Sequence, residues 1–110
     1  MGLFNRSVGF EMISQADAKK IMDERTDYLL LDVRRPEEYA EGYIPGAVLC
    51  PNELIGNTLP AVVKDPNQLI LIYCRSGIRS KQAAKKLAKA GCTQIKEFGG
   101  ITTWPYGITR

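Results

Sequence analysis

The sequence predicts an α/β domain built on a mainly parallel sheet with helices on both faces. Apolar runs of strand length alternate along the chain with segments whose apolar residues recur at helical spacing. This alternation favours parallel strands, because each helix carries the chain back to the start of the next strand. Residues 69–73 form an apolar run without polar alternation, which is typical of a parallel strand buried on both faces.

The first elements are a short strand and a helix. We predict a strand over residues 10–13 and a helix that runs from Ser14 to about residue 22, with Ser14 and Asp17 resembling a capping box. The residues expected on the buried side of this helix are Ile13, Ala16, Ile21 and Met22.

The middle of the chain predicts two strands and several short helical turns. Residues 28–33 form a strand apolar enough to be central, and residues 47–49 form a third strand. Between them, a short helix over residues 35–39 has Pro36 in its first turn, where a missing N–H is tolerated. Residues 53–64 are expected to hold one or two helical turns, interrupted by glycine and proline.

The last three elements determine where a ligand is expected. Residues 69–73 are predicted to be the central strand, residues 79–90 a helix that ends at Gly91, and residues 94–98 the last strand. Ligands of such sheets bind beyond the carboxyl ends of the strands. Cys74 follows the central strand directly and therefore lies at the expected site.

The segment after this strand carries most of the chemical information. It combines a thiol, two guanidinium groups, a glycine and two hydroxyl groups: Cys74, Arg75, Ser76, Gly77, Ile78, Arg79 and Ser80. The free N–H groups and the dipole at a helix start favour a bound anion and the ionised form of a cysteine, and the arginines act in the same direction. We interpret Cys74 as a nucleophilic thiolate in a pocket for a small anion, and Cys50 and Cys92 as small buried hydrophobes.

Length and composition indicate one domain with an N-terminal extension. A chain of 110 residues with 45% hydrophobic and 25% charged residues is ordinary for a soluble domain, and we assign residues 1–9 to the extension and residues 10–110 to the domain. No apolar stretch approaches the roughly 20 residues of a membrane span, and residues 1–9 lack the apolar middle of a secretory signal. We therefore expect a cytoplasmic protein that does not bind a membrane.

Charge and missing residue types argue against several function classes. The net charge of +3 suits a small anionic substrate or an acidic partner, and the lysines of residues 81–89 follow a solvated helix face rather than a nucleic-acid site. Three cysteines without metal-ligand spacing, in a chain without histidine, argue against a metal site, and we expect no cofactor. Without histidine there is no Cys-His pair, so cysteine chemistry must rely on fixed positive charge.

Four stretches resemble the rhodanese domain family, in the order in which that family has them. The segment from Cys74 to Ser80 is similar to its active-site loop. The other stretches are Leu31-Asp32-Val33-Arg34 with Pro36-Glu37-Glu38-Tyr39, then Gly42-Tyr43-Ile44-Pro45-Gly46-Ala47, and finally Gly99-Gly100-Ile101 with Trp104. Together they cover residues 10–107. The resemblance implies a rhodanese-like fold with a five-stranded sheet.

The activity that the resemblance implies is sulfur transfer. Cys74 would take the outer sulfur of thiosulfate or another persulfide donor and pass it on, as a persulfide, to cyanide or to a thiol, including a protein thiol. The N–H groups of residues 75–80 would cradle the bound anion. Within this loop Arg75 would capture the donor and Gly77 would allow the tight turn. Ser76 would either donate a hydrogen bond or cap the helix, and for Ser80 we favour the cap.

A second group of residues is expected to support the loop. The resemblance implies that Asp32 and Arg34 lie near it, and Asp32, at a strand end, is expected to pair with Arg79. We favour a buried ion pair that holds the loop in shape over direct participation in the chemistry. Glu38 either braces the same network or is only an acid at a helix N-terminus.

One departure from the family pattern and two alternative functions stay open. Ala40 and Tyr43 stand where the family's second signature commonly carries histidines, which affects the choice of acceptor rather than the fold. A cysteine-dependent phosphatase of this fold has one residue more between cysteine and arginine than the four found here, and a shorter loop suits sulfur better than phosphate. The other alternative is a sulfur-relay or protein-binding module with little free activity.

Overall fold

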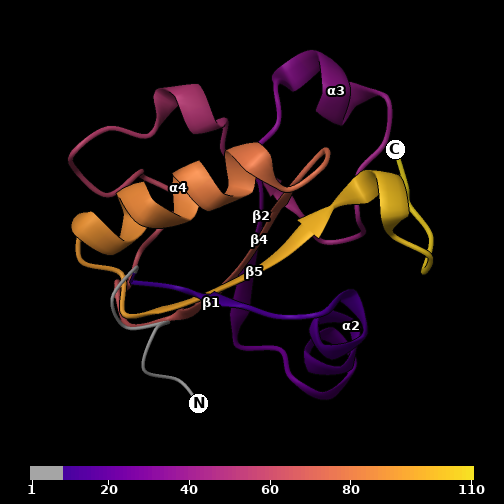
Figure 1. The fold of residues 1–110 in the computed structure, drawn as a ribbon, viewed down its shortest axis with the longest axis horizontal. Coiled ribbons are helices and arrows are strands. Elements are labelled where there is room, and N and C mark those ends of the chain that lie inside the picture. The colour runs from indigo at the N-terminus through magenta and orange to yellow at the C-terminus, as the bar shows by residue number, and fades with distance from the viewer. Residues whose placement is uncertain (1–8) are drawn as a thin grey trace.

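The computed structural model describes residues 9–110, so the predicted extension over residues 1–9 lies outside the described residues except for Gly9. The centre of the fold is a five-stranded sheet whose strand pairs are all parallel, in the order β1-β5-β4-β2-β3 (Figure 1). The strands are β1 (Glu11–Met12), β2 (Tyr28–Asp32), β3 (Val48–Leu49), β4 (Leu69–Cys74) and β5 (Gln94–Gly100). The predicted fold class and the central place of β4 are confirmed.

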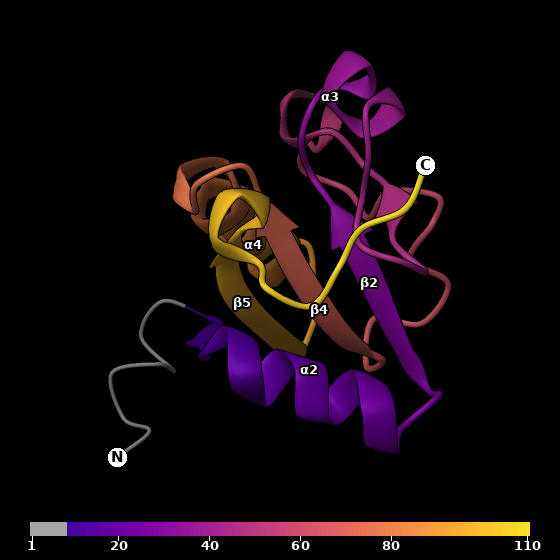
Figure 2. The same ribbon diagram turned by 90° about the vertical axis from the view of Figure 1, so that its right-hand side faces the viewer.

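Helices cover both faces of the sheet, as the sequence predicts (Figures 1 and 2). Helix α4 (Ile78–Lys89) packs Ala83, Ala84 and Leu87 against the β4 side chains that point to its face. Helix α2 (Gln15–Glu24) lies on the opposite face, where Ala18 packs against the alternate side chains of β4. All six residues of β4 are buried, because both faces of the strand are covered.

Helix α2 begins as predicted but buries a different residue. The Ser14 hydroxyl accepts a hydrogen bond from the backbone N–H of Asp17 at 3.0 Å, which confirms the cap. The helix continues to Glu24, and the fully buried residue is Ala18, whereas Ala16 is exposed. The prediction for Ala16 was wrong because residues two apart point to different sides of a helix, and Ala18 shares its side with Ile21 and Met22.

Short helical segments flank the carboxyl end of the sheet. Helix α3 (Pro36–Ala40) has its proline at the first position, as predicted, and the 3-10 turns are η1 (Asn52–Leu54) and η2 (Ile101–Thr103). Among residues 53–64, a turn at the start is the only helical part, because Gly56 and Pro60 interrupt the segment. Near the C-terminus, Thr109 pairs with Tyr43, which brings the end of the chain beside the segment after α3 (Figure 1).

The β4–β5 pair contains an irregularity that shapes the site. The register shifts between Ile72 and Cys74, so that Cys74 lies opposite Gly100, and β5 extends two residues beyond its predicted end at residue 98. A Cβ atom on Gly100 would lie 2.0 Å from the carbonyl oxygen of Arg75. Only glycine therefore allows the loop after β4 to approach the end of β5 this closely.

Candidate active site

The loop after β4 directs a backbone N–H group at the sulfur of Cys74. The Cys74 side chain is 1% exposed, and the N–H of Gly77 donates a hydrogen bond to its Sγ at 2.9 Å. Gly77 has φ 107° and precedes α4, which begins at Ile78, one residue earlier than predicted. The sulfur therefore lies at the positive end of a twelve-residue helix, where negative charge is stabilised.

Residues outside the loop hold its backbone in place. The backbone N–H and the hydroxyl of Thr102, in η2, both donate to the carbonyl oxygen of Arg75, at 3.2 and 3.0 Å. From the other side, the Lys81 ammonium donates to the carbonyl oxygen of Gly77 at 3.1 Å. The loop is thus fixed between η2 and the first turn of α4.

The structure pairs Arg79 with Glu38, which corrects the predicted pair with Asp32. The two guanidinium nitrogens of Arg79 donate to the two Glu38 oxygens at 2.7 and 3.0 Å. The hydrogen bond from Arg79 is the largest influence lowering the pKa of Glu38, which falls from 4.5 to about 2. Glu38 also accepts from the backbone N–H of Arg35, so it acts both as a helix N-terminal acid and as a brace for Arg79.

Asp32 points away from the cysteine loop. It accepts from the Tyr73 hydroxyl at 2.6 Å and pairs with Arg34 at 2.7 Å. Asp32 lies opposite Tyr73 in the register of β2 and β4, and Tyr73 and Cys74, as neighbours in a strand, point to opposite faces. Strand alternation therefore prevents Asp32 from reaching Arg79. Burial and the Asp32 carboxylate raise the pKa of Tyr73.

Arg34 and Arg75 line one cavity beside the loop. This cavity has a volume of about 410 Å³, and its lining also includes Glu38, Thr102 and Trp104. Arg34 is buried and fixed by Asp32 and by the carbonyl oxygen of Gly42, whereas Arg75 is exposed. Arg75 is the loop residue that lines the cavity, and Cys74, its neighbour in sequence, is not part of the lining.

Ser80 does not cap the helix, which corrects a second prediction. It is fully buried within α4, and its hydroxyl donates to the carboxylate of Glu97 at 2.5 Å. The Cys74 sulfur lies 3.4 Å from the same hydroxyl oxygen. Glu97, in β5, is 1% exposed and was not singled out from the sequence. The sequence nevertheless indicates that Glu97 is buried, because Ile95 and Glu97 are two residues apart in the strand and so share its inward face.

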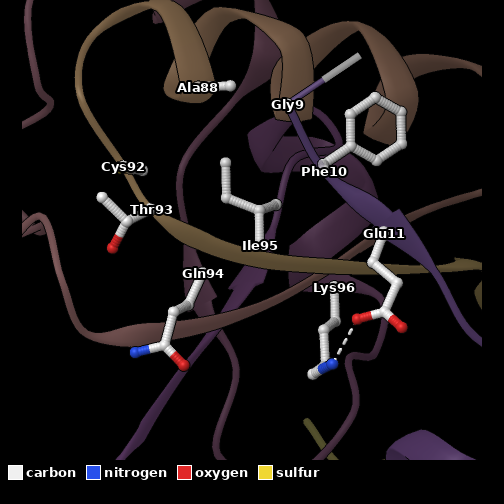
Figure 3. A pocket seen from close by; sticks show the side chains of 9 residues that line it. All are labelled: Gly9, Phe10, Glu11, Ala88, Cys92, Thr93, Gln94, Ile95 and Lys96. Atoms are coloured by element: carbon white, nitrogen blue, oxygen red, sulfur yellow. Dashed lines mark hydrogen bonds and ion pairs between the residues drawn. The ribbon is translucent and has the colours of Figure 1, made fainter. Parts of the chain in front are cut away.

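The other two cysteines are not part of this loop. Cys50 and Cys92 are buried, and burial raises the pKa of both thiols. Cys92 lines a second cavity, of about 520 Å³, where β5 begins at the opposite end of the sheet; Lys96 and Glu11 pair at its edge (Figure 3). No loop residue lines that cavity.

Neither a metal site nor a membrane span is found within residues 9–110. In that part of the chain no three His, Cys, Asp or Glu side chains come together as metal ligands would. The helices there are also too short or too polar to cross a bilayer.

Comparisons with known proteins agree with this geometry. A family model described as the rhodanese-like domain matches residues 14–105. The chain is 36% identical over 97 residues to a sulfurtransferase of Allochromatium vinosum, a match that covers 84% of this chain and 89% of the relative. It is 32% identical to the thiosulfate sulfurtransferase GlpE of Pseudoalteromonas translucida, over 88% of this chain and 90% of the relative. A solved structure of an Escherichia coli rhodanese with anions superposes with a TM-score of 0.68 and 28% identity, covering 76% of this chain and 98% of the other.

Proposed function

This chain belongs to the rhodanese-like domain family, and on that basis we propose that it is a sulfurtransferase that carries a sulfane sulfur as a persulfide on Cys74. The donor is thiosulfate or another persulfide, and the acceptor is cyanide or a thiol, including a protein thiol. The relatives named thiosulfate sulfurtransferase favour thiosulfate as the small-molecule donor. The domain spans residues 10–110, and a cytoplasmic location stays a prediction from the sequence.

One observation carries this proposal: the Gly77 N–H that donates to the Cys74 sulfur at the start of α4. In the first step the thiolate attacks the outer sulfur of thiosulfate, the sulfur–sulfur bond breaks, and sulfite leaves with the electron pair. The outer sulfur of the resulting persulfide is anionic, and a helix N-terminus stabilises such a charge. In the second step the acceptor attacks that outer sulfur and releases Cys74 as a thiolate.

The remaining loop residues hold the donor and shape the cradle. Arg75 is exposed and lines the cavity beside the loop, where it can meet a dianionic donor, and Arg34 adds a second cation to the same wall. The N–H groups of Ser76, Gly77, Ile78, Arg79 and Ser80 supply the cradle. The Glu38–Arg79 pair keeps the start of α4 in position, and Asp32 orients Arg34.

Mass spectrometry of the intact protein after incubation with thiosulfate tests the proposal. We expect one added sulfur on Cys74, removed by cyanide, because the Gly77 N–H stabilises its thiolate. Cys50 and Cys92 should stay unmodified, because burial raises the pKa of both thiols. The matched control is the Cys74→Ser variant, which should gain no sulfur. An equal adduct on that variant, or no adduct on the wild type with either thiosulfate or a persulfide donor, would contradict the sulfurtransferase assignment. Cys74-dependent turnover of an aryl phosphate would favour the phosphatase alternative instead.

A further inference from the structure

A buried carboxylate is connected to the reactive thiol through one hydroxyl group. Cys74 Sγ lies 3.4 Å from Ser80 Oγ, which lies 2.5 Å from Glu97 Oε2. The three residues are 1%, 0% and 1% exposed, so no bulk water separates them. They come from three neighbouring elements, β4, α4 and β5, that meet at the loop.

Cys74, Ser80 and Glu97 form a row of hydrogen bonds, whose directions follow from the number of protons that each side chain carries. Ser80 has a single hydroxyl proton, and an ionised carboxylate can only accept, so Ser80 donates to Glu97. The Ser80 oxygen then faces the sulfur as an acceptor, and the thiol donates to it. Each proton in the row can therefore move along an existing hydrogen bond.

The groups around Glu97 keep its carboxylate in place. The N–H of Gly99, on its own strand, donates to Oε2 at 2.9 Å. From α4, the ammonium of Lys81 lies 3.6 Å from Oε1 and is partly exposed. Glu11 and Lys96, the charged side chains of adjacent positions in β1 and β5, pair with each other, and Arg79 is held by Glu38. Among the ion pairs of the described residues, Lys81 is thus the cation that faces Glu97.

We propose that Glu97 is the internal base of this site and shares one proton with Cys74 through Ser80. The thiol proton moves to the Ser80 oxygen while the Ser80 proton moves to Glu97, which gives a thiolate, a hydroxyl group and a neutral carboxyl group. The net charge of the row does not change in this step. The chain has no histidine that could serve as the base.

This inference rests on the proposed function in one respect only, that Cys74 reacts as a thiolate. During the first transfer step Glu97 keeps the proton while sulfite leaves. After the acceptor has taken the outer sulfur, Cys74 is released as a thiolate, and the proton returns from Glu97 through Ser80. The proton balance of the cycle then closes within the protein.

Titration of the Cys74 thiolate by ultraviolet absorbance tests the shared proton without any sulfur donor. The signal of the Cys74→Ser variant is subtracted to remove the other cysteines. We expect the wild type to titrate in two steps, with a partial thiolate population before the main rise, because coupled groups share their titration. Glu97→Gln, which keeps an acceptor oxygen but cannot take a proton, and Ser80→Ala, which interrupts the row, should each titrate in one step. Glu11→Gln, a carboxylate of the same sheet that is paired with a lysine, should behave as the wild type does.

The rate of alkylation by iodoacetamide, measured at a pH below the main rise in thiolate absorbance, distinguishes the shared proton from the simplest alternative. The two predict opposite changes of this rate in Glu97→Gln. With a shared proton, Glu97→Gln and Ser80→Ala react severalfold more slowly than the wild type. If Glu97 were only a fixed negative charge, its neutralisation would favour the thiolate, and Glu97→Gln would react faster. That result, or a single wild-type step, overturns the proposal. The wild-type titration tests the shared proton even if a variant does not fold. If the wild type titrates in two steps but does not transfer sulfur, only the proposed function is contradicted.

Discussion

At the residue scale, the partly exposed pair of Arg79 and Glu38 makes loop stability depend on pH. The pKa of Glu38 is depressed from 4.5 to about 2, so the folded protein binds this proton less readily than the unfolded chain does. The stabilisation is complete above pH 4.5 and is lost as the pH falls through about 2.

We expect Glu38→Gln to lower the free energy of unfolding by about 1 kcal/mol at neutral pH, a modest value because the pair is partly solvated. Urea unfolding should show this difference shrinking as the pH falls toward 2, where wild-type Glu38 is itself protonated. In a double-mutant cycle with Arg79→Ala, the double variant should lose less than the sum of the single losses. A cycle that instead couples Arg79 to Asp32 would contradict the pairing seen here.

Arg75 is expected to affect the capture of the donor rather than stability. It is exposed, lines the cavity beside the loop, and its backbone, not its side chain, is held by Thr102. Arg75→Ala should raise the KM for thiosulfate about tenfold or more, since a hydrogen bond to a charged group is lost. Steady-state kinetics measure this, with thermal unfolding in parallel. Arg25→Ala, at the far end of α2, is the matched control: it should leave the KM unchanged and alter Tm only slightly, because its ion pair with Asp27 is exposed. A fall in Tm with an unchanged KM would show that Arg75 is structural.

At the scale of elements, the close approach of the loop to β5 makes one glycine indispensable. Gly100→Ala would place a Cβ 2.0 Å from the Arg75 carbonyl oxygen, and the nearest atoms are all backbone, which cannot move aside as a flexible side chain can. We expect a loss of about 2 kcal/mol in the free energy of unfolding, together with loss of sulfur transfer. Gly56→Ala serves as the control, because its Cβ would meet open space and its φ is not in the positive range. Unchanged activity in Gly100→Ala would show that the loop does not need this contact.

The long periodic elements could be predicted from the sequence, whereas the side-chain partners could not. The apolar run of β4 and the helical spacing of α4 place Cys74 at a strand-to-helix junction without any knowledge of the fold. The partner of Arg79 depends on which face of β2 Asp32 occupies, and a shift of one residue in register reverses that face. The contact of Ser80 with Glu97 depends further on how β5 is placed beside α4, which no local pattern encodes.

At the scale of the whole molecule, a buried polar network on the α2 side joins distant parts of the chain. The Tyr73 hydroxyl donates to Asp32 and accepts from the backbone N–H of Ile44, so it links β4, β2 and the segment before β3. Tyr73→Phe should lower the free energy of unfolding by about 1–3 kcal/mol, because both partners lose a hydrogen bond in a buried site.

Urea unfolding of this variant, beside the exposed control Tyr106→Phe, measures the loss. The KM for thiosulfate should stay near the wild-type value, because Tyr73 and Cys74 point to opposite faces of the sheet. A stability equal to that of the control would show that the network contributes nothing to the fold.

The two hydrogen bonds from Thr102 to the Arg75 carbonyl oxygen also determine the orientation of the next N–H group. No cis peptide bond occurs among the described residues, and in a trans peptide the C=O and the following N–H point in opposite directions. With the Arg75 carbonyl directed toward η2, the N–H of Ser76 must point away from η2. A flip of this one peptide plane would exchange a donor for an acceptor on that side and reverse the local dipole. Thr102, in η2, thereby fixes the direction of the dipole of the Arg75–Ser76 peptide, in the loop that begins at the nucleophile.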